Sequence, residues 1–163
     1  MKKMIAATFL AVIPLAAHAE YQQVNLTVFG MDCAPCAHAI HVSMKGIKGV
    51  NTVDVDLNTG LVSIELAPGN SASMRQFNQA VEKNGFTHKD ADIIVKGKLT
   101  GTASAPVLEV SGTSDRYALS PATSTLDIAS LLGKTVAVGG VLPQAPKGKL
   151  SDTLRYKTIT EAQ

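Results

Sequence analysis

Hydrophobic and polar residues alternate in three short stretches near the start of the chain, and this alternation predicts strands with one buried face. The first stretch covers residues 24–28 and stops at Gly30. The second and third cover residues 53–57 and 62–66, and the sequence Asn58-Thr59-Gly60 between them places a glycine where a hairpin connection needs one. We therefore expect three strands, of which the last two form a hairpin.

Two further stretches place their hydrophobic residues three and four positions apart, as one face of a helix requires. The first begins at Cys36, and the second follows Ser73, which forms a capping-box pattern with Gln76. A short fourth strand begins at Phe86. The order strand, helix, strand, strand, helix, strand predicts an α+β domain of the ferredoxin-like βαββαβ type over residues 20–91, with both helices on one face of an antiparallel sheet.

The remaining residues, 92–163, predict a small, mostly-β domain. A short helix pattern, Leu126–Leu132, lies between the third and fourth of five strand patterns, which is the order of an OB-type barrel. Its only aromatic residues are Tyr117 and Tyr156, and no cysteine, histidine or acidic cluster marks a site, so we expect a docking or scaffold role. The expected strands cover residues 93–99, 106–110, 116–119, 135–141 and 154–159.

The distribution of charge supports a division of the chain near Asp90–Asp92. Residues 20–92 carry five basic and eight acidic side chains, a net charge of −3, whereas residues 93–163 carry eight basic and five acidic ones, a net charge of +3. No linker rich in proline or serine separates the two parts, so we expect them to pack closely. The opposite charges favour this packing only weakly, because salt screens them.

The first 19 residues have the pattern of a cleaved secretory signal peptide. Lys2 and Lys3 precede an apolar stretch over residues 4–17, which is short for a membrane span, and a small-x-small cleavage pattern ends at Ala19. We therefore expect a periplasmic protein that begins at Glu20 and has no membrane insertion. Without this peptide the chain has 13 basic and 13 acidic residues, and a neutral protein is a poor candidate for binding nucleic acid.

The two cysteines of the chain, Cys33 and Cys36, are three positions apart at the junction of the first strand and the first helix. A disulfide between them would close a loop of two residues and stabilise the fold weakly, so the pair has a chemical role rather than a structural one. A helix N-terminus favours the thiolate of Cys36, and thiolates bind soft ions such as Cu(I) or Hg(II). Whether the resting pair is reduced or oxidised stays open at this point.

The string Gly30-Met31-Asp32-Cys33-Ala34-Pro35-Cys36, followed by a helix and by Asn84-Gly85-Phe86, resembles the heavy-metal-associated domain over residues 22–91. This family includes copper chaperones, the N-terminal domains of metal-exporting ATPases and the periplasmic mercuric-ion-binding protein. The resemblance implies that Cys33 and Cys36 bind one soft metal ion and pass it to a transporter or another carrier by ligand exchange.

Three neighbours of the cysteines have roles that the resemblance suggests. Met31 packs into the core beneath the loop in this family, an interpretation that we favour over a thioether ligand. Phe86 is expected either to pack under the loop and limit the access of water, or simply to pack in the core. Asp32 resembles the G-M-D-C loops of zinc- and cadmium-exporting ATPases, where its carboxylate would be an auxiliary ligand for Zn(II), Cd(II) or Pb(II). Alternatively, Asp32 stabilises the N-terminus of the helix.

The outer face of the first helix carries no fixed charge near the cysteines. His38, His41 and Val42 lie on or beside this face, and the two histidines are interpreted as solvated rather than as metal ligands. A weakly polar surface beside a metal-binding loop suggests a surface for docking a partner protein.

Thiol-disulfide oxidoreductase activity is a second candidate function, because Cys-Ala-Pro-Cys also resembles the active site of such an enzyme. Such a site usually follows a tryptophan and a buried central strand, whereas this chain has no tryptophan and a different order of elements. The sequence therefore favours an exported metal-binding protein that is not an enzyme. Cu(I) is the favoured ion, followed by Hg(II) and then Zn(II) or Cd(II).

Overall fold

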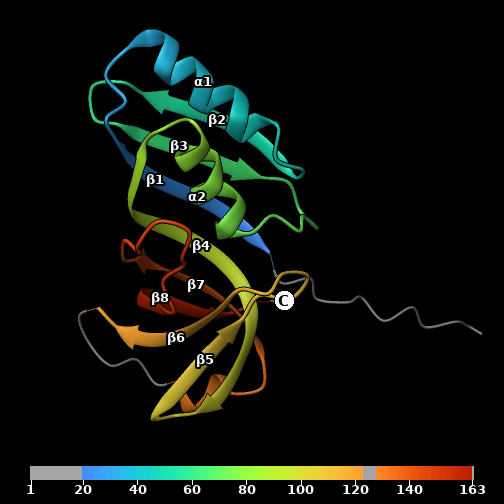
Figure 1. The fold of residues 1–163 in the computed structure, drawn as a ribbon. Helices are drawn as coiled ribbons and strands as arrows, with labels where there is room; N and C mark the ends of the chain where they lie inside the picture. The colour runs from blue at the N-terminus through green and yellow to red at the C-terminus, as the bar shows by residue number, and fades with distance from the viewer. Residues whose placement is uncertain (1–19, 123–127, 163) are drawn as a thin grey trace, which may run out of the picture.

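The computed structural model describes residues 20–122 and 128–162, and within these ranges eight strands form one continuous sheet that two α-helices cover in part (Figure 1). The strand order is β2-β3-β1-β4-β5-β6-β8-β7, with an additional pairing between β4 and β7. The expected signal peptide, residues 1–19, lies outside the described residues. Among the residues described, no helix has both the length and the apolar character needed to cross a membrane.

The first part of the chain has the predicted βαββαβ order. Its elements are β1 (Tyr21–Phe29), α1 (Ala34–Lys45), β2 (Val50–Asp56), β3 (Leu61–Leu66), α2 (Met74–Lys83) and β4 (Thr87–Thr102). The four strands pair antiparallel in the order β2-β3-β1-β4, and both helices lie on the same face of this sheet (Figure 1). The ferredoxin-like arrangement is therefore confirmed.

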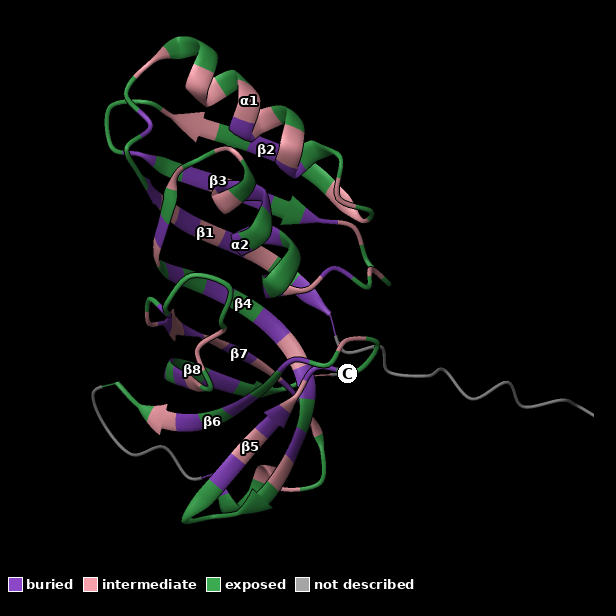
Figure 2. Cartoon of the chain, in the orientation of Figure 1, coloured by how far each residue is buried: buried purple, intermediate pink, exposed green. Residues whose placement is uncertain are grey.

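The buried residues of this part follow the periods seen in the sequence (Figure 2). In β1, Val24, Leu26 and Val28 are buried while the residues between them are partly exposed. Ile40 and Met44 form the buried face of α1. The capping box predicted at the start of α2 is present, and the Ser73 backbone N–H donates to Gln76 Oε1 at 2.9 Å. These residues place the core between the helices and the sheet.

The hairpin between β2 and β3 is fixed to the end of β1. Gly60 has a φ angle of +72°, and its carbonyl accepts a 2.8 Å hydrogen bond from the Val28 N–H. A Cβ atom at Gly60 would lie 2.5 Å from the Val28 carbonyl oxygen, so a side chain at this position would force the two segments apart. The glycine predicted from the sequence is thus required by the turn and by this close approach.

The fourth strand is much longer than the sequence predicted. A short strand beginning at Phe86 and a separate one over residues 93–99 were expected, but β4 is a single strand of 16 residues. It pairs with β1, β7 and β5 at successive and partly overlapping positions. The expected division near Asp90–Asp92 falls inside this strand, where both aspartates are exposed and Ala91 is buried.

The later part of the chain is mostly β, as predicted. Its strands are β5 (Ala105–Glu109), β6 (Arg116–Pro121), β7 (Thr135–Leu142) and β8 (Thr153–Glu161). The pairings β4–β5, β5–β6, β6–β8, β8–β7 and β7–β4 close into a ring, and β6–β8 is its parallel pair.

Two sequence predictions for this later part need comment. The helix predicted over Leu126–Leu132 lies partly outside the described residues, and its described part contains a single 3₁₀ turn, η1 (Ala129–Leu131). Tyr117 and Tyr156 are 1% and 2% exposed and belong to the core, so neither forms part of an exposed binding surface.

A buried polar cluster joins the two parts of the molecule. The Tyr21 hydroxyl donates to Asp115 Oδ2 at 2.7 Å and lies 2.6 Å from the Tyr117 hydroxyl. The N–H of Met74, at the start of α2, donates to the same Asp115 oxygen at 2.9 Å. Burial and the neighbouring Asp115 raise the pKa of Tyr117, and burial with both neighbours raises the pKa of Tyr21. The cluster thus keeps both tyrosines protonated and fixes the later part against β1 and α2.

The connection between β7 and β8 supplies a second contact between the two parts. The N–H of Gly148 donates to Glu82 Oε1 at 3.0 Å, and the N–H of Gln144 donates to Asp90 Oδ1 at 2.7 Å. His88, which is buried in β4, places its Nε2 3.2 Å from the same Glu82 oxygen. The close packing of the two parts expected from the sequence is therefore observed at both ends of α2.

Candidate metal centre

The cysteine loop connects the end of β1 to the start of α1. Gly30 ends the strand with a φ angle of +89°, a conformation that glycine adopts without steric cost. Cys33 is the N-cap residue of α1, and its Sγ accepts a 3.2 Å hydrogen bond from the backbone N–H of Cys36. Pro35 lies in the first turn, where its missing N–H leaves no donor unpaired. The sequence therefore places both sulfur atoms at the positive end of the helix dipole.

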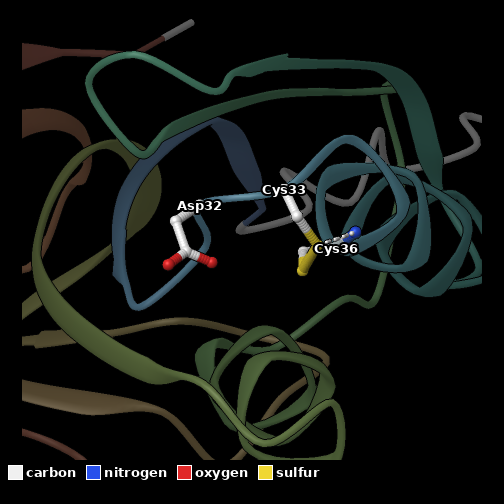
Figure 3. Close-up of side chains that lie close together, drawn as sticks. All are labelled: Asp32, Cys33 and Cys36. Atoms are coloured by element: carbon white, nitrogen blue, oxygen red, sulfur yellow. Dashed lines mark hydrogen bonds between the residues drawn. A yellow bond between two sulfur atoms is a disulfide. The ribbon is translucent and has the colours of Figure 1, made fainter.

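Cys33 and Cys36 are joined by a disulfide, with their Cα atoms 5.1 Å apart (Figure 3). Both residues are half-buried, so the sulfur atoms lie at the surface of the fold rather than in its core. The structure therefore shows the oxidised form of the pair. Reduction of this bond would leave two thiols at the N-terminus of α1, close enough to bind one ion.

Asp32 completes a group of three potential ligands. One carboxylate oxygen of Asp32 and the Sγ atoms of Cys33 and Cys36 all lie within 4.8 Å of one another (Figure 3). Two sulfurs suit a soft ion, and an added oxygen suits a borderline ion such as Zn(II). The donor atoms present thus fit a metal ion of either kind.

Asp32 lies one residue before the N-cap of α1, where its charge can still act on the helix dipole. The N-cap position is occupied by Cys33, whose sulfur makes the capping hydrogen bond, and no acidic residue lies in the first turn of α1. Asp32 is exposed, and its carboxylate accepts no hydrogen bond from a described residue. Its carboxylate is therefore available to an ion.

Met31 lies in the loop itself, and Phe86 lies near the first residue of the loop. Met31 is 4% exposed and belongs to the core, which favours packing over a ligand role for its thioether. Phe86 is half-buried, and a Cβ atom at Gly30 would lie 3.7 Å from its Cδ1 atom. The phenyl ring therefore packs against the residue that begins the loop.

The two histidines of α1 lie outside the ligand group. His38 is exposed and His41 is half-buried, and neither belongs to the group of donor atoms formed by Asp32 and the cysteines. Val42 is 54% exposed on the same helix. His38 and Val42 are thus exposed on α1, and the docking role of this helix surface stays a prediction.

One feature near the loop was not expected from the sequence. Phe29, the last residue of β1, is 67% exposed, and Lys89 Nζ lies 5.2 Å from the centroid of its ring. The alternation in β1 places residue 29 on the polar face of the strand, which is the one signal that could have indicated its exposure. An aromatic ring is therefore exposed at the strand end that leads into the loop.

The fold and the site together define a domain with a half-buried cysteine pair at the start of its first helix. A model of the heavy-metal-associated domain matches residues 25–87. The copper chaperone CopZ of Staphylococcus saprophyticus is 33% identical over 65 residues, which are 40% of this chain and 94% of that protein. The chain therefore belongs to the heavy-metal-associated domain family.

Other similar proteins come from mercury systems and from solved structures. The mercuric transport protein periplasmic component of Pseudomonas fluorescens is 31% identical over 88 residues, which are 53% of this chain and 93% of that protein. A solved CopZ metallochaperone has 32% identity and a TM-score of 0.38, covering 40% of this chain and 97% of its own. Oxidized MerP from Ralstonia metallidurans CH34 has 25% identity and a TM-score of 0.39, with coverages of 42% and 94%.

Proposed function

We propose that the reduced chain binds one soft metal ion through Cys33 and Cys36 and passes it to a transporter or another carrier. The observation that carries this proposal is the pair of sulfur atoms at the N-terminus of α1. Relatives named as a copper chaperone and a mercuric transport protein support Cu(I) as the first cargo and Hg(II) as the second. The protein acts as a carrier in this proposal, not as an enzyme.

The binding step begins from the dithiol. Two electrons and two protons convert the disulfide into two thiols, and a cellular thiol or dithiol that becomes oxidised supplies them. An ion then replaces the thiol protons, so that its binding releases protons and weakens at low pH. A half-buried pair leaves room for a thiol of the partner, which joins the ion before Cys33 or Cys36 leaves it.

Asp32 extends the range of possible cargo. Its carboxylate lies within the same 4.8 Å group as the two sulfurs, and an oxygen ligand would favour Zn(II) or Cd(II) more than Cu(I). Cu(I) remains the favoured ion because the two thiolates alone complete its coordination. Asp32 would therefore change the preference among ions rather than create the site.

The remaining parts of the chain have proposed roles in location and support. Residues 1–19 have a signal-peptide pattern, and a periplasmic relative is consistent with a periplasmic protein. We assign residues 20–91 to the metal-binding domain and residues 92–163 to an OB-like barrel that shares β4 with it. The closed ring of pairings and the parallel β6–β8 pair support this barrel, for which we propose a scaffold role.

Metal competition tests this function. The reduced chain is titrated with Cu(I), Hg(II), Zn(II) and Cd(II), each against a chelator of known affinity, and Cys33→Ser is titrated in parallel. We expect the wild-type chain to bind Cu(I) and Hg(II) most tightly and Cys33→Ser to lose at least a hundredfold in affinity for both. Equal affinities of the two proteins would refute the proposed function.

Thiol-disulfide oxidoreductase activity is the second candidate, and the disulfide at the start of a helix favours it. The reduction of insulin disulfides by the chain in the presence of dithiothreitol tests it. Turnover that requires both Cys33 and Cys36 would favour the redox function over metal transfer.

A further inference from the structure

Exposed hydrophobic residues gather at the end of the sheet that carries the cysteine loop. Among the described residues, five large hydrophobic side chains are exposed. Three of them lie at this end: one at the end of β1, one in the connection between β2 and β3, and one at the start of β3. Figure 1 shows this connection beside the loop into α1. These three residues, here called the loop-side patch, are Phe29, Leu57 and Leu61, with exposed fractions of 67%, 37% and 37%.

The sheet register brings two members of the loop-side patch together. Leu61 of β3 pairs directly with Thr27 of β1. Phe29 is two residues further along β1 and therefore points to the same face as Thr27. Phe29 and Leu61 are thus diagonal cross-strand neighbours, a spacing at which a phenyl ring reaches an aliphatic side chain. Phe29 and Leu61 alternate with the buried residues of their strands and therefore lie on the face of the sheet opposite to α1 and α2, whereas Leu57 lies in the connection after β2.

Several interactions hold the loop-side patch in one arrangement. The hydrogen bond from the Val28 N–H to the Gly60 carbonyl fixes the hairpin to β1. Within the hairpin, Asp56 accepts hydrogen bonds from the Thr59 hydroxyl at 2.7 Å and the Asn58 N–H at 2.9 Å, which lower the pKa of its carboxyl. Lys89 lies over the Phe29 ring. A surface that is already ordered loses less entropy when a partner binds.

We propose that the loop-side patch is the apolar docking surface for the protein that exchanges metal with Cys33 and Cys36. This inference rests on the proposed function. Exchange between thiolates requires the partner's own cysteines to reach the ion, so the partner must cover the surface around the loop. Three residues separate Phe29 from Cys33, a span of at most about 14 Å. An interface of standard size covers roughly 800 Å² on each protein, which is enough to extend from the cysteine pair to Phe29.

The chemistry of the patch specifies the kind of partner. We infer a metal-binding domain that has its own cysteine pair beside an aliphatic or aromatic surface. The charged groups nearest to the patch in sequence or contact are Asp56, Asp32 and Lys89, which carry both signs and a net charge of only −1. Association should therefore depend weakly on ionic strength, unlike docking that is guided by opposite charges.

Site-specific photo-crosslinking in metal-treated cells tests the location of this surface. The photo-crosslinking residue benzoylphenylalanine replaces Phe29 in the full chain. In two further variants it replaces Ile94, the matched control, or Val42, which represents the helix surface. Ile94 is 41% exposed on the outer face of the sheet but lies beside the later strands, where it pairs with Gly139 of β7. We expect position 29 to capture a protein with a cysteine pair, and position 94 to capture none of it.

Metal transfer between purified proteins provides the second measurement. The captured protein receives Cu(I) from the reduced full chain, and Phe29→Ser and Leu61→Ser are compared with Ile94→Ser. We expect each patch variant to slow the transfer about tenfold at limiting protein concentration, as loss of an interface anchor does, and Ile94→Ser to leave the rate within twofold. Transfer to glutathione, a small thiol that needs no docking surface, should proceed at the wild-type rate in all three variants.

The outcomes separate this inference from the proposed function. Four crosslinking results would each overturn the docking surface. They are capture of the same protein at position 42 but not at 29, capture of lipid alone at 29, equal capture at 29 and 94, and no capture at 29. Equal transfer rates for Phe29→Ser and Ile94→Ser would also overturn it, while Cu(I) binding by Cys33 and Cys36 would be unaffected. Failure of the proposed function would instead appear as Cu(I) affinity that does not depend on these cysteines.

Discussion

The Tyr21 hydroxyl donates a hydrogen bond to Asp115 Oδ2 at 2.7 Å, although 94 residues separate them in the sequence. Tyr21 begins the first strand of the metal-binding part, and Asp115 precedes β6 in the later part. The same Asp115 oxygen accepts the N–H of Met74 at the start of α2. The later part therefore supports both a strand and a helix of the metal-binding part.

Replacement of Asp115 should destabilise the whole molecule. Asp115→Asn exchanges a buried acceptor of two hydrogen bonds for an amide, and we expect the free energy of unfolding to fall by about 1–3 kcal/mol. Denaturant unfolding of the full chain measures this change. Asp54→Asn, an exposed substitution on β2, is the control and should change the value by no more than about 0.5 kcal/mol. Equal stability of the two variants would show that the cluster does not join the parts.

High pH should weaken the fold through the two clustered tyrosines. Burial raises the pKa of Tyr21 and Tyr117, so the folded chain keeps both protons after the unfolded chain has lost them. Stability is then fully present below about pH 10, the ordinary pKa of tyrosine, and falls above it by about 1.4 kcal/mol per pH unit for each residue. Denaturant unfolding between about pH 9 and 11 measures the slope.

The tyrosine variant makes this pH prediction specific. Tyr117→Phe removes one of the two titrating hydroxyls and should roughly halve the alkaline slope. A slope in Tyr117→Phe that equals the wild-type slope would contradict the role given to the cluster.

Removal of the later part should destabilise the metal-binding part, even though relatives of its length match this chain. A fragment of residues 20–91 ends inside β4 and loses the pairing of β1 with residues 93–95 as well as the Asp115 contacts. We expect a large decrease in melting temperature relative to the full chain, measured by circular dichroism. A fragment that unfolds cooperatively at the temperature of the full chain would instead show that the two parts are independent.

Substitution of Asp32 should change metal preference without abolishing binding. Asp32→Asn removes the one charged oxygen ligand near the sulfurs, and we expect about a tenfold loss of affinity for Zn(II) and Cd(II). Affinity for Cu(I) should remain within about threefold, because two thiolates satisfy this ion. Asp54→Asn serves again as the exposed control, and competition with a chelator measures all affinities. Equal losses for Cu(I) and Zn(II) would contradict the ligand role of Asp32.

The sequence predicted the local elements well because their signals are local. Alternation identified β1, β2 and β3, and glycine at positions 60 and 85 marked two turns that adopt positive φ angles. The cysteine loop was equally clear, because Gly30 and the helix that follows place Cys33 and Cys36 at a helix start. Features that depend on a few adjacent residues could therefore be predicted from the sequence.

The sequence did not predict the features that depend on distant contacts. The continuity of β4 through residues 90–92 has no local signal: Asp90 and Asp92 lie on the exposed face of this long strand, and Ala91 between them is buried. The contact between Tyr21 and Asp115 has no local signal, because each residue is ordinary in its own segment. Exposure of Phe29 depends on which face of β1 the helices cover, which tertiary packing decides.

X-ray absorption spectroscopy of the Cu(I)-loaded, reduced chain tests the central claim most directly, because it identifies the atoms bound to the ion. We expect two sulfur neighbours per copper, one Cu(I) per chain, and loss of one of these sulfurs in Cys36→Ser, with Met31→Leu as the control that leaves the spectrum unchanged. The account would be contradicted by a first shell dominated by nitrogen or oxygen, or by a spectrum that is the same in the wild-type chain and in Cys36→Ser.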